Sequence, residues 1–555
     1  MGQEMKRALG PELTGTLFDI VVIGGGITGA ATARDAALRG MSVLLVEKDD
    51  FAAGTSSRSS KLIHGGLRYL ETYQFKLVAE SVRERERMLA LAPHLTEVRP
   101  FLYLIYEGYP ESKTLLNLGL TFYDVASGSR RKRRHRMLSA RQVLEFEPYL
   151  RAEGLLGAGM YYDVLTDDAR LTLDTAKGAA EAGTQLLNHT AVTGLLIENG
   201  RSRGVRITDS LTGDIFDVHA RQVLNATGPW TDSTRALEHT PSTHKLRPTK
   251  GVHIVVKKSD FPLDTAVFLR SPDDNRVVWP TPSLEKDVVY IGTTDTDYQG
   301  DLDDVHPDAA DIRYLLNVAN HTIPEARLTE AHVVGSWAGL RPLVAPATGV
   351  STGNTSREHS ITTGSTGMIT ISGGKLTSNR VMAKQLVDAA EAALGRKRAR
   401  RSVAAHTPIS GGASPITSQT LDRALAAGVP PETADLWARR YGSNSQNLLE
   451  RWKQDAANRE VIGARNLTRA ELRYGVEEEM VRSIQDLLVR RTSTFFWDSE
   501  GGLAEIKRVA DELAAALGWS QAHRAKEIDE YRALVEKHRP PLPALPLGRD
   551  GHGHV

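Results

Sequence analysis

The stretch from Asp19 to Glu47 constrains the fold of this chain more than any other. It opens with Ile20–Ile23, a short apolar run of the kind that forms a buried parallel strand. Three glycines follow at Gly-x-Gly-x-x-Gly spacing, at positions 24, 26 and 29. In that order they permit a tight turn, let the backbone approach a pyrophosphate, and let a helix pack closely on the strand.

The residues after the glycines complete a dinucleotide-binding unit. We expect a helix from about Ile27 to Arg39 and a second strand from Ser42 to Val46. The helix N-terminus offers free N–H groups to phosphates, and Glu47 follows the glycines at roughly the 20-residue distance at which an acid accepts from a ribose hydroxyl. Glycines alone also occur in ordinary loops, but this context favours a cofactor site. Because an acid there would repel a 2'-phosphate, the pattern argues against NADP.

Composition excludes several classes of function. A chain of 555 residues is too long for one core, and we expect roughly two to four domains. Lysine plus arginine number 69 against 68 for aspartate plus glutamate, so no global charge favours nucleic acid. The sequence has no cysteine, which excludes disulfides, thiolate nucleophiles and iron–sulfur ligation by this chain.

No targeting or membrane-spanning segment is predicted. Pro11 and Glu12 interrupt the N-terminal segment before the apolar region of a secretory signal develops, and no run reaches the ~18 apolar residues of a membrane span. We therefore expect a cytoplasmic protein whose contact with the inner face of a membrane is peripheral. The basic run Arg130–Arg136 is typical of a solvated loop, and contact with anionic lipid or a partner is the alternative.

A loop crowded with hydroxyls, glycines and cations follows the dinucleotide unit, from Thr55 to Tyr69. Such a loop is by itself most often a solvated connection, but in this position we interpret it as wrapping the pyrophosphate of the cofactor. Residues 59–70, Ser-Ser-Lys-Leu-Ile-His-Gly-Gly-Leu-Arg-Tyr-Leu, closely resemble the FAD-dependent sn-glycerol-3-phosphate dehydrogenases, respiratory enzymes that pass electrons to quinone. Further matches run through most of the chain.

Two later glycine turns extend the resemblance. A strand ending at Leu224 delivers Asn225–Trp230, which matches the family's second FAD motif. Met368–Thr377 repeats the strand, glycine turn and helix, and this helix N-terminus would stabilise negative charge on a reduced flavin. Small residues at the strand ends permit close backbone approach. The cofactor domain is therefore expected to be discontinuous, assembled from three stretches.

Periodicity predicts the elements between these turns. Helices are expected from about Phe75 to Leu91 and from Asp168, as N-cap, to Ala182. Residues 192–207 and then 217–224 alternate in the manner of an antiparallel ribbon, residues 246–298 are β-rich, and residues 418–533 are helical.

The resemblance implies an α/β fold: an FAD-binding Rossmann-like domain with a β-rich substrate-binding cap and a C-terminal all-helical domain. The expected boundaries are residues 18–95, 155–235 and 330–392 for the FAD-binding domain, 96–154 and 236–329 for the cap, 405–538 for the helical domain, and 539–555 for a disordered tail. His552 and His554 in that tail lack partners at metal-site spacing, so we expect no metal site.

The resemblance also assigns the site residues. Those expected to bind FAD are Gly24, Gly25, Gly26, Ile27, Thr28, Gly29, Glu47, Lys48, Thr55, Ser56, Ser60, Lys61, Leu62, His64, Asn225, Ala226, Thr227, Gly228, Gly373, Gly374, Lys375, Leu376 and Thr377. Those expected to bind substrate are Arg68, Tyr69, Arg341, Arg357 and Lys375. A single arginine is usually a surface or ion-pair residue, but arginine forks and a lysine point charge together suit a phosphate dianion. A phosphate-bearing substrate is the leading hypothesis.

The implied reaction is FAD-dependent oxidation of sn-glycerol 3-phosphate to dihydroxyacetone phosphate, in glycerol and glycerophospholipid metabolism, with electrons passed to a membrane quinone. The flavin accepts hydride from the second carbon while a base takes the hydroxyl proton. His64 and His253 are base candidates because a neutral imidazole accepts a proton near working pH, and Arg341 is the alternative that would stabilise the alkoxide. The three are unranked, and His253, which alternates with apolar neighbours, also fits a buried structural histidine.

Two other functions stay open. A glycerol-3-phosphate oxidase would use oxygen in place of quinone, although we see no obvious mid-chain insertion of the kind its relatives carry. A non-catalytic flavin-binding module is the more distant alternative, and the cation cluster disfavours it. The expected partners are the phosphorylated substrate, the quinone and a second copy of the chain in a homodimer, with no nucleic acid.

Overall fold

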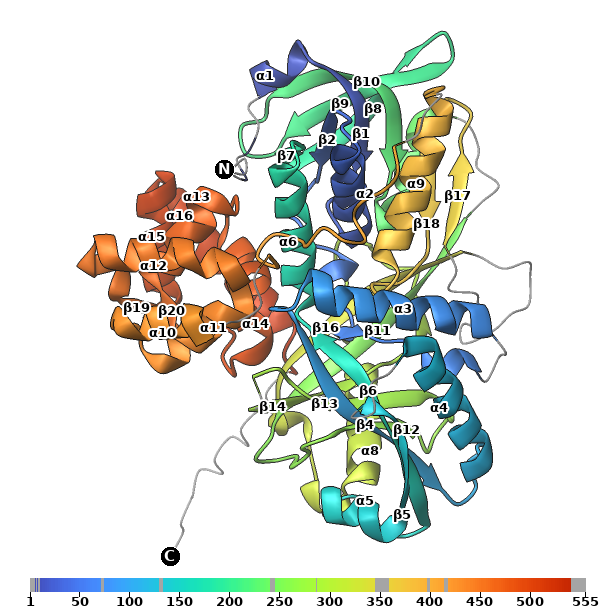
Figure 1. Cartoon of the computed structure of the whole chain (residues 1–555). Coiled ribbons are helices and arrows are strands. Elements are labelled where there is room, and N and C mark those ends of the chain that lie inside the picture. The colour runs from blue at the N-terminus through green and yellow to red at the C-terminus, as the bar shows by residue number, and fades with distance from the viewer. Residues whose placement is uncertain are drawn as a thin grey trace, which may run out of the picture.

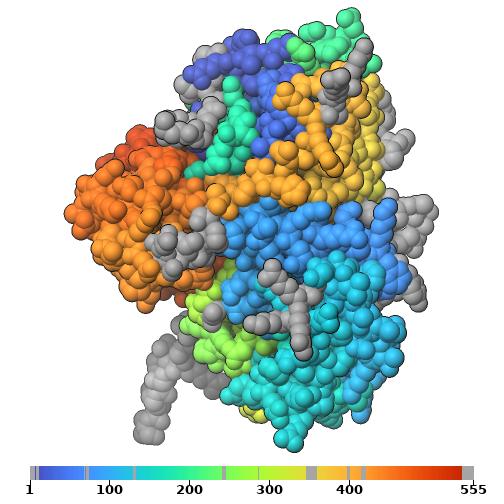
Figure 2. All heavy atoms as spheres, viewed as in Figure 1, coloured from blue at the N-terminus to red at the C-terminus, as the bar shows by residue number. Residues whose placement is uncertain are grey.

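The computed structural model describes residues 5, 7, 10–70, 74–128, 133–239, 245–285, 287–344, 359–396, 400–413 and 418–540. Figure 1 shows a sheet with helices packed on it at the top, a second sheet below, and a cluster of C-terminal helices, in orange, beside their junction. In the space-filling view of Figure 2 the orange helices lie against both sheet units. The α/β fold and the C-terminal helical unit agree with the prediction.

The first unit is a mostly parallel sheet built around β1 (Leu17–Ile23). β1 pairs in parallel with β2 (Val43–Val46) and with β10 (Ile215–Asn225), which pairs in parallel with β18 (Ile369–Ser372). The remaining strands are β7 (Gln185–Leu187), β17 (Ser360–Thr363) and the predicted antiparallel ribbon of β8 (Thr190–Glu198) and β9 (Arg201–Asp209). Parallel strands from distant parts of the chain therefore end at one edge of this sheet.

Short helices and long helices pack on this sheet (Figure 1). They are α1 (Gly10–Thr14), α2 (Ile27–Leu38), α6 (Asp168–Glu181), α7 (Thr231–Arg235) and α9 (Asn379–Ala393). The alanines of α2 are buried among α6 and α9, because small side chains let helices approach closely. Arg39, at the end of α2, is 1% exposed and pairs with Asp35 at 2.5 Å and with Glu391 of α9 at 2.9 Å.

The second unit is a ten-stranded sheet of mixed direction among the described residues. Its long strands are β4 (Thr96–Tyr106), β6 (Leu155–Thr166), β11 (Leu246–Lys257) and β16 (Val333–Val344), and its short strands are β3 (Leu62–Ile63), β5 (Arg136–Ser139), β12 (Ala266–Arg270), β13 (Val277–Pro282), β14 (Val288–Gly292) and β15 (Thr296–Asp297). Four helices accompany it: α3 (Phe75–Leu91), α4 (Lys113–Ser127), α5 (Ala140–Phe146) and α8 (Ala309–Thr322). β6 and β16 lie in this sheet, within stretches that the sequence pattern assigned to the cofactor domain.

The C-terminal unit is helical, as its periodicity predicts. Its helices are α10 (Ser418–Ala426), α11 (Pro431–Tyr441), α12 (Ser445–Gln454), α13 (Arg469–Glu478), a π-helical segment Asp486–Arg491, α14 (Thr494–Trp497), α15 (Ile506–Leu517) and α16 (Gln521–Lys537). A two-stranded ribbon, β19 (Val461–Gly463) with β20 (Leu467–Thr468), is an addition to the predicted all-helical pattern. Phe496 and Trp497 pack against Trp337 of β16, which joins this unit to the second sheet.

The start of α6 differs from the prediction. Asp167 is the N-cap, because its carboxylate accepts from the backbone N–H of Arg170 at 3.0 Å. Asp168, the predicted cap, is fully buried and instead accepts from Lys61 Nζ at 2.6 Å. Aspartate suits a cap at either position, and the ion pair of Asp168 with a distant lysine decides between them.

Some predictions fall outside the described residues. These include Arg357, residues 130–132 of the basic run, and the tail from residue 541 with His552 and His554. Within the described part of the chain, no helix combines the length and the apolar character that crossing a bilayer requires.

Candidate active site

A cavity of about 450 Å³ lies at the edge where the parallel strands of the first sheet end. The turns after β1, β2, β10 and β18 all contribute to its wall. Ligands of open α/β sheets bind at this carboxyl edge. Three stretches that are far apart in the sequence, around Gly24, Thr227 and Gly373, therefore line a single cavity.

The first glycine turn has no room for side chains. Gly24 has a φ of +105°, and a Cβ at Gly29 would lie 1.8 Å from the carbonyl O of Gly24. A Cβ at Gly25 would lie 2.8 Å from side-chain atoms of both Glu47 and Phe51. Gly26 faces the cavity, so backbone forms the wall where α2 begins.

Glu47 closes the first turn at the end of β2. Its carboxylate accepts from the backbone N–H of Gly25 at 2.6 Å and from that of Asp49 at 2.9 Å. Removal of this carboxyl from water raises its pKa to about 7, although both N–H donors lower it. Glu47 lines the cavity, and it holds the acid position of a ribose-binding turn.

A cluster of three side chains forms the wall next to Glu47. The ammonium of Lys48 lies 4.5 Å from the ring centroid of Trp230 and pairs with Asp303. The indole N–H of Trp230 donates to Asp303 at 2.9 Å. Asp303 lies in the loop after β15 of the second sheet, so this cluster bridges the two sheet units across the cavity.

The third glycine turn, Gly373–Leu376, also lines the cavity. The hydroxyl of Thr377 donates to the carbonyl O of His64 at 3.1 Å. The ammonium of Lys375 lies 3.6 Å from the ring centroid of Tyr69. These contacts bring a cation, a phenol and the His64 loop together beside the cavity.

The two candidate histidines have different surroundings. The ring of His253 is 3% exposed, stacks on Trp337 at 4.8 Å between centroids, and has its Nε2 at 3.0 Å from the hydroxyl of Ser60. Burial and then the nearby Arg341 and Lys61 charges hold the pKa of His253 well below its usual range. His64 is partly exposed, with its ring centroid 6.4 Å from that of Trp279. Neither ring is among the residues that line the cavity.

Arg341 lies on β16, next to the cavity residue Pro342. Its guanidinium pairs with Asp295 at 3.1 Å and donates to the hydroxyl of Thr293 at 3.0 Å. A Cβ at Gly251 would lie 2.4 Å from the guanidinium, so this glycine lets the arginine lie flat against β11. The contacts hold the cation in a fixed position.

The predicted cofactor residues divide into two groups. Those that line the cavity are Gly24, Gly26, Ile27, Thr28, Glu47, Lys48, Thr55, Ser56, Ala226, Thr227, Gly228, Gly373, Gly374, Lys375 and Leu376. Those that do not are Gly25, Gly29, Ser60, Lys61, Leu62, His64, Asn225 and Thr377. Lys61, for example, is 3% exposed and lies between Asp168 and the ring of Phe496, 4.3 Å from the ring centroid. The side chain of Arg68 and all of Arg357 lie outside the described part of the chain.

Sequence reasoning missed several cavity residues. Asp303 reaches the wall from a distant loop, and no local pattern marks it. Trp230 had a signal, because it ends the Asn225–Trp230 motif. Thr190–Val192, in the first part of β8, also line the cavity.

The residues present fit a dinucleotide such as FAD. A first turn with no room for a Cβ at Gly24, Gly25 or Gly29, a helix N-terminus and an acid lie together at the cavity, and these are the features that receive pyrophosphate and ribose. Lys375 and the loop of His64 lie beside the other glycine turn.

Comparison with known proteins gives a consistent result. The family described as FAD dependent oxidoreductase matches residues 19–380, and that described as C-terminal domain of alpha-glycerophosphate oxidase matches residues 402–524. The chain is 38% identical to the aerobic glycerol-3-phosphate dehydrogenase of Bacillus subtilis, over 96% of this chain and 97% of the relative, and 37% identical to that of Staphylococcus haemolyticus, over 94% of each. The solved glycerol-3-phosphate dehydrogenase of Bacillus halodurans complexed with FAD is 33% identical, with a TM-score of 0.81 and coverage of 97% of this chain and 98% of that chain.

Glu47 predicts a pH dependence of cofactor binding. Because burial raises its pKa to about 7, the folded apoprotein holds this proton below that pH. We propose that ribose hydroxyls of FAD donate to this carboxylate, so binding must release the proton, and we expect FAD affinity to fall below pH 7 by up to about tenfold per pH unit. Fluorescence titration of apoprotein with FAD between pH 5.5 and 8 measures this. Glu47→Gln should bind more weakly at pH 8 and show a flat profile, whereas an equal slope in both proteins would contradict the assignment.

Proposed function

The chain belongs to the FAD-dependent oxidoreductase family, and within it we propose that this protein oxidises sn-glycerol 3-phosphate to dihydroxyacetone phosphate with FAD as cofactor. The observation that carries the proposal is the position of Lys375, which lines the cavity and also contacts Tyr69 of the family motif. A cation beside the reactive end of the cofactor suits a substrate that carries a phosphate. Relatives with the same printed activity along nearly the whole chain support this choice.

The protein's part in the reaction is to hold the substrate and move one proton. When bound, FAD accepts the hydride that leaves the second carbon of the alcohol. We assign the phosphate to Lys375, with Arg68 and Arg357 as further ligands on the strength of the family pattern. Arg341, which Asp295 and Thr293 hold in place, would stabilise negative charge on the substrate oxygen as its proton leaves.

We rank His64 above His253 as the base. His253 is stacked and buried, and its Nε2 is engaged with Ser60, so its ring serves packing between β11 and β16. His64 is partly exposed and belongs to the loop that contacts the third glycine turn. Proton transfer needs a group within hydrogen-bond reach of the substrate. The partly exposed ring of His64 meets this requirement more readily than the buried ring of His253.

The ranking predicts different effects for two matched substitutions. His64→Asn should lower the rate of anaerobic flavin reduction by about 10²- to 10⁴-fold, because the base is lost. His253→Asn should mainly lower the melting temperature. Stopped-flow absorbance of fully FAD-loaded proteins measures the rate. An equal or larger rate loss in His253→Asn would reverse the ranking.

The phosphate assignment predicts a change in substrate affinity. Lys375→Met should lower kcat/KM for sn-glycerol 3-phosphate by about 10²-fold or more, because a charge-assisted contact to the phosphate is lost. Lys375→Arg should recover part of it. Lys48→Met is the control: it removes a cation from the same cavity at the Trp230 end, and should weaken FAD binding with KM unchanged. Unchanged turnover in folded, flavin-loaded Lys375→Met would contradict the assignment.

We further propose that the electron acceptor is a membrane quinone and that the contact is peripheral, on the inner face of the cytoplasmic membrane. An exposed apolar face of α4 supports this. Leu115 and Leu118 are each 62% exposed and Val125 is 76% exposed, and their spacing places them on one side of the helix. Phe75 of α3, 47% exposed, packs its ring on Phe122 at 5.3 Å and extends the face. Figures 1 and 2 show α3 and α4 on the outside of the molecule.

Charge next to α4 favours an anionic bilayer as the surface that meets this face. Arg133, Arg134 and Arg136, the described arginines of the predicted basic run, have exposed side chains and follow α4 in the chain. An apolar face bordered by arginines is typical of helices that lie in a membrane interface.

On the family resemblance alone we also propose a homodimer, whose mass light scattering would measure.

Quinone-containing anionic vesicles test the surface and the acceptor together. Leu115→Ser with Leu118→Ser should reduce flotation with vesicles and quinone reduction by about tenfold or more, because apolar area no longer enters the lipid. Turnover with a water-soluble acceptor should not change. The control is Leu211→Ser with Ile215→Ser, which alters apolar residues that are 46% and 63% exposed at the β9–β10 connection. Undiminished flotation of the α4 variant would exclude this surface, and peroxide release without quinone reduction would favour an oxidase.

A further inference from the structure

The turn that carries Glu47 is held from behind by the C-terminal helical unit. Glu47, Lys48 and Asp49 line the cavity, whereas the next residue, Asp50, is fully buried and does not. The Asp50 carboxylate accepts from Arg490 Nε at 2.6 Å, from Arg491 Nη1 at 2.5 Å and from Arg491 Nη2 at 3.0 Å. Both arginines belong to the π-helical segment Asp486–Arg491.

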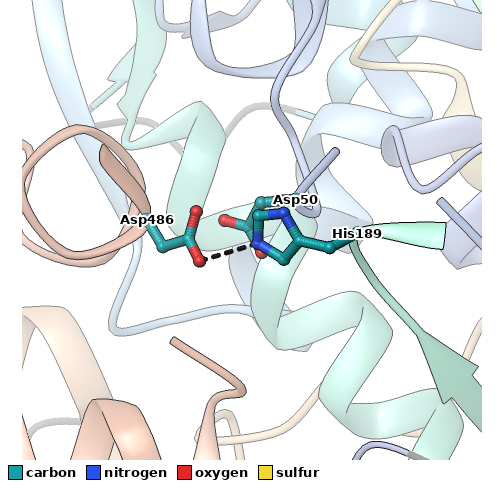
Figure 3. Close-up of side chains that lie close together, drawn as sticks. All are labelled: Asp50, His189 and Asp486. Carbon is teal, nitrogen blue, oxygen red and sulfur yellow. Dashed lines mark hydrogen bonds and ion pairs between the residues drawn. The ribbon is translucent and has the colours of Figure 1, made fainter. Parts of the chain in front are cut away.

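A second set of hydrogen bonds also joins the Glu47 turn to the C-terminal helical unit. The backbone N–H of His189 donates to the carbonyl O of Asp49, and that of Thr190 donates to the carbonyl O of Glu47 at 2.8 Å. The ring of His189 then bonds Asp486 at 3.0 Å. Figure 3 shows Asp50 and His189, from the cofactor unit, facing Asp486 on the C-terminal segment.

This cluster is a charge network and does not form a metal site. Ligand atoms of Asp50, His189 and Asp486 lie within 4.8 Å of one another, which is close enough to hold an ion. However, Arg490 and Arg491 already occupy the Asp50 oxygens, and Arg490 Nη2 also donates to Asp486 at 2.5 Å. The positive charges of the two guanidinium groups balance the negative charges of the two carboxylates. A divalent cation at this position would be repelled by both guanidinium groups.

Arg491 is anchored so that it can fix Asp50. It is 1% exposed, and its Nε and Nη2 also donate to the carbonyl O of Glu479 at 3.2 and 2.6 Å. The carboxylate of Glu479 makes two hydrogen bonds to Arg170 of α6, at 2.8 and 2.9 Å. The arginine therefore has little freedom, and the planar fork sets the orientation of the Asp50 carboxylate.

We propose that Arg490 and Arg491 are positioning residues for the cofactor. By holding Asp50, the C-terminal unit keeps the Glu47–Asp50 turn in the shape that receives the ribose end of FAD, so cofactor affinity depends on that unit. The inference rests on the proposed function, since it requires FAD in the cavity. Preorganisation of this kind changes ligand affinity without new contacts to the ligand.

Cofactor affinity in matched variants tests the proposal. Arg491→Met should raise the Kd for FAD by roughly 10-fold or more, measured by fluorescence titration of apoprotein, and should lower the temperature of flavin release below that of global unfolding. Arg491→Lys, which keeps charge without the fork, should lie between. Asp50→Asn should reproduce the loss, and combining it with Arg491→Met should add little. In the molecules that retain FAD, sn-glycerol 3-phosphate should reduce the flavin at the wild-type rate.

Arg465→Met is the matched control. This arginine of the C-terminal unit pairs with Glu285 and Asp287, beside β14, at 3.1 Å each, so it also links two units but lies away from the turn. Its FAD Kd should stay within about twofold of wild type. An unchanged Kd in folded Arg491→Met or Arg491→Lys, or an equal rise in Arg465→Met, would overturn the inference. A wild-type protein that binds no FAD would instead refute the proposed function.

Discussion

Close packing of backbone at the glycine turns is the constraint on which the rest of the structure depends. A Cβ at Gly29 would lie 1.8 Å from the carbonyl O of Gly24, and a Cβ at Gly24 would lie 2.7 Å from the carbonyl O of Ala226. The first turn is therefore fixed against both α2 and the second turn. Since β1, β10 and β18 pair in parallel, the third turn reaches the same edge, and main-chain atoms form a wall of the cavity that suits phosphates.

Buried ion pairs hold the other parts of the molecule around that wall. Lys61 with Asp168, Arg170 with Glu479, and Arg491 with Asp50 are nearly or fully inaccessible to solvent. Removing one partner from such a pair leaves a buried charge, at a cost of about 3–5 kcal/mol. Two of these pairs join the C-terminal helices to the cofactor unit, so the helical unit is held firmly against the domain that forms the cavity.

Sequence patterns predict those elements whose structure depends on residues that are close together in the chain. Apolar periodicity and glycine spacing were enough for the strand, turn, helix and acid of residues 19–47, and α3 has the predicted bounds. They could not separate Asp167 from Asp168 as a cap, because Lys61 decides it. Asp303 at the cavity, and the pairing of Asp50 with arginines more than 400 residues away, depend on tertiary contacts that no local pattern encodes.

We propose that the cavity holds FAD next to a site for a phosphorylated alcohol. An anaerobic absorbance spectrum of the purified protein, recorded before and after addition of sn-glycerol 3-phosphate with glycerol as the comparison, tests it most directly. We expect the oxidised-flavin band to bleach with the phosphorylated compound alone. A flavin spectrum that neither compound changes would contradict the substrate assignment, and folded protein without flavin would contradict the interpretation of Gly24 to Glu47.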